Sequence, residues 1–221
     1  MSFDPGSRSK LTHRDLPRFG DGTLFHRIAQ KVCEAECLPR KELYEAWEVA
    51  RRTRRRFRGG RVVDLACGHG LLAQMLLLLD DSSACALAVD ARLPDSAEPL
   101  REALSSGWPR LIGRVEFVEA PLASVAVSGA DLLVSCHACG ALTDRVLDHA
   151  IAARAKIVVL PCCHDKLASD GGGLGGWLDS ALAIDVTRAS RLRSHGYVVH
   201  TQTIPAAITP KNRLLLAEPA G

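Results

Sequence analysis

The spacing of hydrophobic residues changes about a quarter of the way along the chain. Between residues 22 and 57 they recur at intervals of three or four, which predicts two helices separated by a break at Cys37-Leu38-Pro39. Beyond residue 60, short apolar runs alternate with helical stretches such as 71–79 and 141–154. The runs that we expect to be strands cover residues 62–67, 85–90, 115–120, 130–136, 156–162, 196–204 and 212–217.

This alternation predicts a doubly wound sheet. Strands that are apolar throughout are typical of parallel sheets with helices on both faces. The last two runs are separated by about eight residues that include Pro205 and Pro210, too few for a helical crossover, so these runs should pair antiparallel. The expected fold is therefore α/β and Rossmann-like, with five parallel strands, a C-terminal antiparallel pair and an N-terminal helical extension.

The chain divides into three predicted segments. Residues 1–20 are polar, contain Gly and Pro and lack periodicity, so we expect a flexible arm, in part docked. Residues 21–60 form the helical extension, which has a basic end, and residues 61–221 form the α/β domain. The 221 residues suit one domain of ordinary size.

Composition narrows the class of protein. Hydrophobic residues make up 47% of the chain, which is normal for a globular protein. The most apolar run, 71–79, is far shorter than the roughly 20 residues of a membrane span, and residues 1–11 lack the apolar region of a secretory signal. We therefore expect a cytoplasmic protein without membrane contact, whose eight cysteines serve packing, catalysis or metal binding rather than disulfides.

A glycine-containing turn follows the first predicted strand, where residues 62–70 read VVDLACGHG. In a parallel sheet this turn lies at the carboxyl edge, where ligands bind. The glycines let a ligand approach the backbone, and the helix that follows offers free N–H groups. Asp64 suits a cationic ligand, and Asp90, at the end of the second strand, suits ribose hydroxyls. The plain alternative is a tight turn with two incidental acids.

These motifs resemble those of class I S-adenosylmethionine-dependent methyltransferases. The segment VVDLACGHG is similar to the first motif of that family, residues 88–90 (AVD) are similar to the second, and the terminal antiparallel pair matches its seven-stranded sheet. The resemblance covers roughly residues 60–217 and implies S-adenosyl-L-methionine as the cofactor of a methyltransferase domain at 61–221. The cofactor-binding residues that it implies are Asp64, Ala66, Cys67, Gly68, His69, Gly70, Asp90, Ala91, Ala120, Leu122 and Cys136.

Two neighbouring strands are expected to end in cysteines and histidines, at residues 135–140 (SCHACG) and 160–164 (LPCCH). Adjacent strands lie ~5 Å apart, so these groups should gather beside the cofactor. Three interpretations are open: cysteines that only pack, a metal site, and an active-site wall that faces the acceptor. We favour the wall and predict no metal, because neighbouring strand residues point to opposite faces. The candidate catalytic residues are His137, Cys139, Asp144, Cys162 and His164.

The H-x-C-G motif after the fourth strand and the P-C-C-H motif after the fifth resemble a subgroup of these enzymes. The subgroup contains the eukaryotic enzymes that 2′-O-methylate the tRNA acceptor stem, the methyltransferase domain of the glutathione S-transferase C-terminal-domain-containing protein, and ribosomal-RNA-adenine-dimethylase-like proteins. This resemblance implies RNA, either tRNA or rRNA, as substrate. A hydroxyl acceptor needs a base, for which His137, His164 and Asp144 are the candidates in that order.

Positive charge is concentrated at the front of the chain. Residues 1–61 carry 15 Lys and Arg against 8 Asp and Glu, whereas the remainder carries 13 against 17. Seven arginines fall within residues 51–61, more than stabilisation of a helix end needs, which favours a phosphate-binding patch over a solvated helix end. The predicted nucleic-acid-binding residues are Arg51, Arg52, Arg54, Arg55, Arg56 and Arg58.

The function that these observations favour is methylation of RNA with S-adenosylmethionine as donor. A methyltransferase of a protein side chain or of a small molecule is the first alternative. A non-catalytic partner protein that binds the cofactor or a metal is the second. Nucleic-acid binding with a steep salt dependence would favour the RNA substrate, and a stoichiometric metal would favour the metal site.

Overall fold

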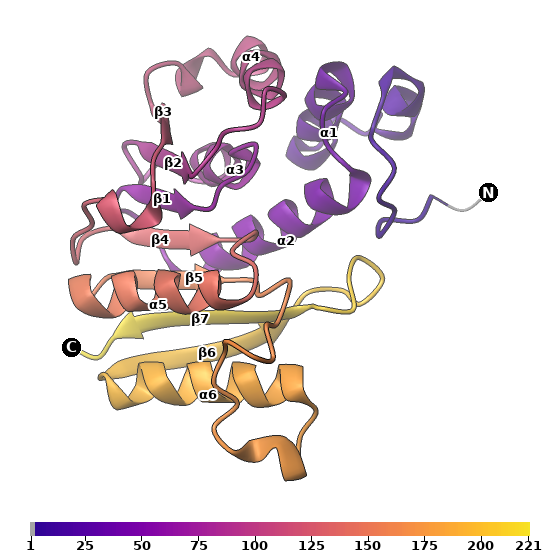
Figure 1. Cartoon of the computed structure of the whole chain (residues 1–221). Helices are drawn as coiled ribbons and strands as arrows, with labels where there is room; N and C mark the ends of the chain where they lie inside the picture. The colour runs from indigo at the N-terminus through magenta and orange to yellow at the C-terminus, as the bar shows by residue number, and fades with distance from the viewer. Residues whose placement is uncertain (1–2) are drawn as a thin grey trace.

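The computed structural model describes residues 3–221 and contains one sheet covered by helices on both faces (Figure 1). The strand order is β3-β2-β1-β4-β5-β7-β6. The strands are β1 (Val62–Leu65), β2 (Ala86–Asp90), β3 (Val115–Glu119), β4 (Leu132–Ser135), β5 (Lys156–Val159), β6 (Tyr197–Thr203) and β7 (Arg213–Pro219). The predicted Rossmann-like sheet of seven strands is confirmed.

Strand direction also follows the prediction. Strands β1 to β5 are parallel to one another, and β7 runs antiparallel to both β5 and β6. Since β1 lies between β2 and β4, the order of the strands reverses beside β1, and this reversal is the switch point at which open α/β sheets bind ligands. The turn after β1 is therefore in the position that a ligand site requires.

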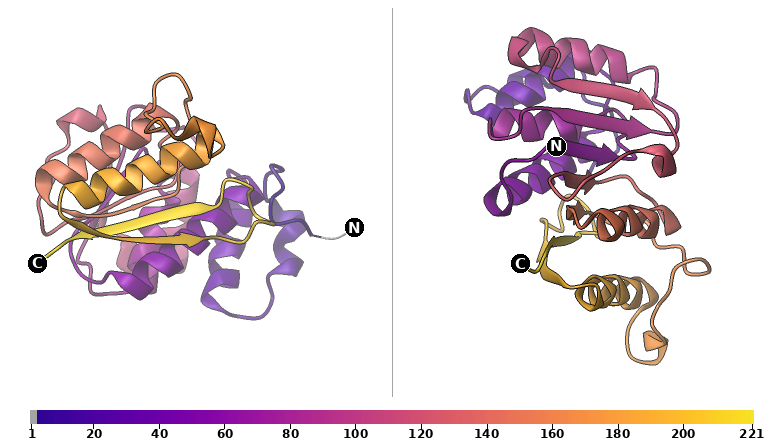
Figure 2. Two further views of the ribbon diagram at one scale, coloured as in Figure 1. Left: turned by 90° about the horizontal axis from the view of Figure 1, so that it is seen from below. Right: turned by 90° about the vertical axis from the view of Figure 1, so that its left-hand side faces the viewer.

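The helices form two layers, one on each face of the sheet (Figure 2). Helices α1 (Leu24–Ala35), α2 (Arg40–Arg56), α3 (Leu71–Leu79) and α4 (Ala97–Gly107) belong to one layer and its apolar core. Helices α5 (Ala141–Ala153) and α6 (Ser180–Ser194) cover the other face. Helix α3 has no charged residue because it lies between the sheet and α2, which together bury nearly its whole surface.

For residues 1–20 the expectation is an arm that is flexible or partly docked. Its described part is docked on α1 and α2, with Leu11 and Phe19 almost completely buried and Lys10 in an isolated antiparallel bridge to Pro39. The ring of Phe19 makes edge-on contacts with Phe3 and Phe25. A few apolar side chains anchor the segment. Because they are spaced without periodicity, the hydrophobic pattern gave no indication of how the segment docks.

Helix α2 connects the two edges of the sheet. Near its start, Glu42 lies beside His69 of the turn after β1, at the carboxyl edge. Near its end, Arg54 donates to the hydroxyl of Ser83 in the loop before β2, at the amino edge. Among residues 3–221, no helix combines the length and the apolar character that a membrane-spanning segment requires.

Candidate active site

The turn after β1 has an unusual backbone. Ala66, Gly68 and Gly70 all have positive φ angles, of 56°, 54° and 69°. A side chain at Gly70 would clash with the ring of Phe117, so the turn also needs glycine for space. The N–H of Gly68 donates to Oδ2 of Asp90 at 2.9 Å, which ties the first motif to the second. Glycine adopts a positive φ angle without strain, so Ala66 is the strained residue of the three, and strain held by its surroundings is typical of a functional turn.

A cavity of about 460 Å³ opens beside this turn, and its size is that of an ordinary small-molecule site. Five of the predicted cofactor residues line it: Ala66, Asp90, Ala91, Ala120 and Leu122. Helix α5 adds a wall that sequence reasoning missed, formed by Leu142, Arg145, Asp148 and His149. The helical spacing of these four positions was the available signal. An acid at the rim and apolar walls fit the ribose and the adenine of a nucleoside.

The remaining predicted cofactor residues lie on the other side of the turn. Cys67 and His69 meet His137 beneath α2, around a space of only about 10 Å³. The Nε2 of His69 is 2.8 Å from the hydroxyl of Ser96. This space is too small for a methionine chain. Cys136 is buried at the end of β4.

Asp64 is a buried carboxyl group for which no neighbouring cation is found among residues 3–221. Its residue is 1% exposed, and Oδ2 accepts one hydrogen bond, from the N–H of Ala73 at 3.2 Å. Burial, reinforced by the negative charge of Asp90, raises the pKa of Asp64 to about 8. A cationic ligand group would restore the charged form. The residues present therefore fit S-adenosylmethionine, which carries an ammonium and a sulfonium beside its nucleoside.

His137 is neutral at physiological pH. Burial first, and then the positive charges of Lys41 and His69, lower its pKa to about 4. Its ring lies against Gly68, where a Cβ would be 3.8 Å from the Cδ2 atom of His137. A neutral imidazole next to the cofactor turn can accept a proton, which agrees with the role expected for this residue.

The other two candidate bases make firm contacts elsewhere. The Nε2 of His164 is 2.8 Å from Asp185 on α6, and its side chain is 4% exposed. Both oxygens of Asp144 accept hydrogen bonds from Arg188 at 2.8 Å. The side chain of His164 is thus buried, and Asp144, although partly exposed, has both oxygens engaged by Arg188. Their catalytic roles stay predictions, and the contacts instead favour anchoring of the two motifs.

Arg188 is a buried supporting residue that sequence reasoning missed. It is 2% exposed, and it joins Asp144, Asp185 and the carbonyl of Gly140. The signal was present, because Arg188 lies between the buried Ile184 and Leu192 at intervals of four on α6, a position that should be apolar. A buried arginine between two carboxylates holds the loops after β4 and β5 against α6.

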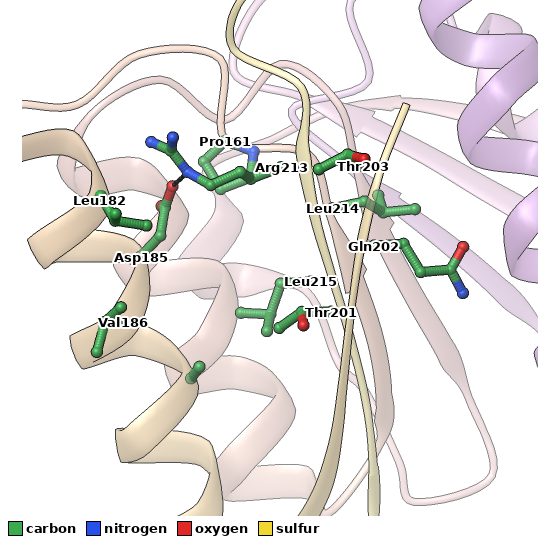
Figure 3. Close-up of a pocket in the computed structure, with 11 residues that line it drawn as sticks. Pro161, Leu182, Asp185, Val186, Thr201, Gln202, Thr203, Arg213, Leu214 and Leu215 are labelled. Atoms are coloured by element: carbon green, nitrogen blue, oxygen red, sulfur yellow. Dashed lines mark hydrogen bonds and ion pairs between the residues drawn. The ribbon is translucent and has the colours of Figure 1, made fainter. Parts of the chain in front are cut away.

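A second large cavity, of about 450 Å³, lies between α6 and the strands β6 and β7 (Figure 3). Leu182 and Val186 of α6 face Leu215 of β7 across it, and the ion pair of Asp185 with Arg213, 2.7 Å long, closes one end. None of the predicted site residues lines this cavity. It is thus separate from the space beside the turn.

Three of the four clustered cysteines come together. The Sγ atoms of Cys139, Cys162 and Cys163 all lie within 4.8 Å of one another. Cys139 and Cys163 border an open depression of about 490 Å³, and two of its lining residues, Leu142 and Arg145, also line the cavity beside the turn. The predicted gathering of thiols at this edge is thus present, except that Cys136 does not join it.

The arginines of residues 51–58, at the end of α2, lie away from this site. Members of this run form ion pairs with Glu48, Asp80 and Glu218, and the buried Arg54 donates to Ser83 and to the carbonyl of Leu76. Among the described residues, Arg55 is the member of the predicted set for which no ion pair or hydrogen bond is found. Phosphate binding by the run stays a prediction, with Arg55 as its most available member.

Comparisons with known proteins agree with this geometry. Residues 41–170, more than half of the chain, match the family described as "Methyltransferase domain". A glutathione S-transferase C-terminal domain-containing protein from Xenopus laevis is 55% identical over 31 residues, which are 14% of this chain and 5% of that protein.

Solved structures share the fold at low identity. An O-methyltransferase family protein from Burkholderia thailandensis gives a TM-score of 0.52 at 19% identity, covering 94% of this chain and 63% of that one. The M1A22 tRNA methyltransferase TrmK of B. subtilis gives 0.52 at 15%, covering 80% and 65%. TrmK of M. capricolum, solved with S-adenosyl-homocysteine, gives 0.51 at 12%, covering 77% and 66%. The chain thus spans less than two thirds of these structures. It belongs to the methyltransferase-domain family, whose cofactor is S-adenosylmethionine.

Proposed function

We propose that this chain transfers a methyl group from S-adenosylmethionine to RNA, with a ribose 2′-hydroxyl of tRNA or rRNA as the first candidate acceptor. The motifs at 137–140 and 161–164, which resemble those of the tRNA acceptor-stem enzymes, support this substrate class. We place the activity in the cytoplasm, where the reduced thiols of such motifs persist.

One observation carries the proposal: the docked N-terminal segment brings exposed cations to the carboxyl edge. Arg8, Lys10 and Arg14 are exposed, and no ion pair or hydrogen bond of their side chains is found among the described residues. The charge of Lys10 reaches the turn after β1, because it adds to the effect of burial in lowering the pKa of His69. Free cations around a cofactor site suit a polyanionic substrate.

In this mechanism the bound cofactor supplies an electrophilic methyl group on a sulfonium. Asp90 accepts hydrogen bonds from ribose hydroxyls while it holds Gly68, and Asp64 balances a cationic group of the ligand. Helix α2 and the N-terminal segment exclude water from the turn. His137, neutral above about pH 4, takes the proton of the acceptor hydroxyl.

The test is transfer from labelled S-adenosylmethionine to fractionated RNA, protein and small-molecule pools. We expect label in RNA, and we expect Lys10→Glu with Arg14→Glu to weaken RNA methylation strongly while cofactor affinity is kept. Arg193→Glu is the matched control, because it reverses an exposed cation in the last turn of α6, at the amino edge and outside the predicted nucleic-acid-binding set. Label confined to protein or metabolites would contradict the RNA substrate, as would equal effects of the two sets of variants.

A further inference from the structure

The loops after β4 and β5 hold three thiols in one place. Cys139 comes from the first loop, and Cys162 and Cys163 come from the second. A backbone hydrogen bond from Gly140 to the carbonyl of Cys163, 3.1 Å long, joins the loops directly. Arg188 of α6 donates a hydrogen bond to the carbonyl of Gly140 as well. The thiols are thus positioned by the fold and do not depend on a single mobile loop.

The three sulfurs lie close enough together to share one metal ion. Thiolates that share a tetrahedral zinc ion at ~2.3 Å lie about 3.8 Å apart. The three Sγ atoms here are all within 4.8 Å, and the pair from Cys139 and Cys162, 2.9 Å apart, is closer than that spacing. Metal binding therefore requires the exposed Cys139 side chain to turn away from Cys162.

A positive charge lies beside the cluster. The ammonium of Lys211 is 3.6 Å from the Sγ of Cys163. Three thiolates bound to one divalent cation leave a net negative charge, which this ammonium would offset.

We propose that Cys139, Cys162 and Cys163 bind a borderline-soft divalent metal ion, with zinc as the natural occupant. Thiolate sulfur selects such ions over magnesium or calcium. Among residues 3–221, no histidine, carboxylate or further cysteine lies close enough to be a fourth ligand. Three protein ligands with an open position are the arrangement of catalytic zinc sites. The open position faces the depression that shares Leu142 and Arg145 with the cofactor cavity.

The experiment uses the full chain, reduced, freed of metal with a chelator and titrated with Co²⁺ under nitrogen. Zinc has no absorption bands of its own, whereas thiolate-bound Co²⁺ shows charge-transfer bands and the ligand-field bands of tetrahedral coordination. We expect both sets of bands to saturate at about one ion per chain and to disappear when Zn²⁺ is added. A shift of the ligand-field bands on adding imidazole or a small thiol will report the open position.

Cys139→Ser, Cys162→Ser and Cys163→Ser should each weaken Co²⁺ binding by more than the ~10–100-fold that loss of a supporting residue costs. Cys85→Ser, in the loop before β2 at the amino edge, is the matched control and should bind as the parent does. Far-ultraviolet circular dichroism will show that each variant is folded. The proposal is overturned if the reduced parent gives no charge-transfer bands, if Cys163→Ser keeps them, or if the outcome is only a disulfide between Cys139 and Cys162.

Discussion

The amino edge and the carboxyl edge of the sheet are both rich in charge, but they use it differently. At the amino edge, cations are matched with acids: Arg61 pairs with Asp131 at 2.8 Å, and Arg56 pairs with Glu218 at the same distance. At the carboxyl edge, no cation pairs with Asp64 and no carboxylate pairs with Lys10 among residues 3–221. This difference shows that a high density of charged residues in a sequence does not by itself identify a binding surface. What matters is whether the fold has already provided each charge with a partner.

The largest expected effect tests the base at the carboxyl edge. His137→Ala should lower turnover by ~10²–10⁴ and keep cofactor affinity, because loss of a general base removes proton transfer and not ligand contacts. In the parent, the acidic limb of the pH–rate profile should lie near pH 4, below which His137 is protonated. Steady-state kinetics with calorimetry check both points. His200→Ala, near Arg56 at the amino edge, is the control; if it lost as much turnover, the assignment would be wrong.

The next effect compares the two buried arginines, Arg188 and Arg54. Arg188→Leu leaves Asp144 without its ion-pair partner and should lower the free energy of unfolding by ~3–5 kcal/mol. Arg54→Leu loses hydrogen bonds to a carbonyl and a hydroxyl and a longer ion pair to Asp80, which keeps Arg58 as a partner, and should cost ~1–3 kcal/mol. Denaturant titration measures both. Arg188→Leu combined with Asp144→Leu should recover part of the loss; no recovery would show that the ion pair is not the cause.

A smaller effect concerns the second motif. Asp90→Ala should weaken S-adenosylmethionine binding by roughly 1.5–3 kcal/mol, the range for hydrogen bonds to a charged group. The fold should persist, because Asp90 ends a strand and is only half-buried. Asp131→Ala, which removes the carboxylate paired with Arg61 at the amino edge, should leave the affinity unchanged. Calorimetric titration that finds equal affinity for parent and Asp90→Ala would remove Asp90 from the site.

The pH dependence of cofactor binding tests the unpaired acid. In the free protein the pKa of Asp64 is about 8, so the carboxyl is protonated below that pH, whereas a cationic ligand binds the ionised form. Affinity should therefore rise up to about tenfold per pH unit toward pH 8 and then level off. The folded protein holds this proton up to about pH 8, whereas the unfolded chain releases it at lower pH. The stability of the free protein should therefore fall as pH rises toward 8. Asp64→Asn should flatten both curves; an unchanged slope in that variant would assign the dependence to another group.

The smallest expected effect belongs to the arginine run. Neutralising Arg52, Arg55 and Arg56 together should flatten the salt dependence of RNA binding by about one unit, not three, since a lost phosphate contact changes the slope by ~0.9. The reason is that Arg52 and Arg56 are already paired with Glu48 and Glu218. Filter binding at a series of salt concentrations measures the slope. A loss of three units would mean that RNA displaces these internal partners.

The sequence alone was sufficient for the architecture. The alternation of apolar runs and helices predicted all seven strands, and the antiparallel pair expected at 196–204 and 212–217 is found as β6 and β7. The turn after β1 was also predictable, since glycine at positions 68 and 70 marks backbone conformations that other residues avoid. The strands and the turn depend mainly on residues that are close together in the chain, so the local spacing of apolar residues and glycines is enough to predict them.

The tertiary structure alone decided which charges and thiols are free to act. Arg188 meets Asp144 across 44 residues and Arg61 meets Asp131 across 70, so no local pattern reveals that these groups are already paired. In the same way, the fold separates Cys136 from Cys139 while it brings Cys139 to Cys162 and Cys163. The hydrophobic period fixes where strands and helices lie. A buried charge is costly unless it is paired, and its partner can come from any segment that packs against it. Packing between distant segments therefore decides which buried polar groups are paired.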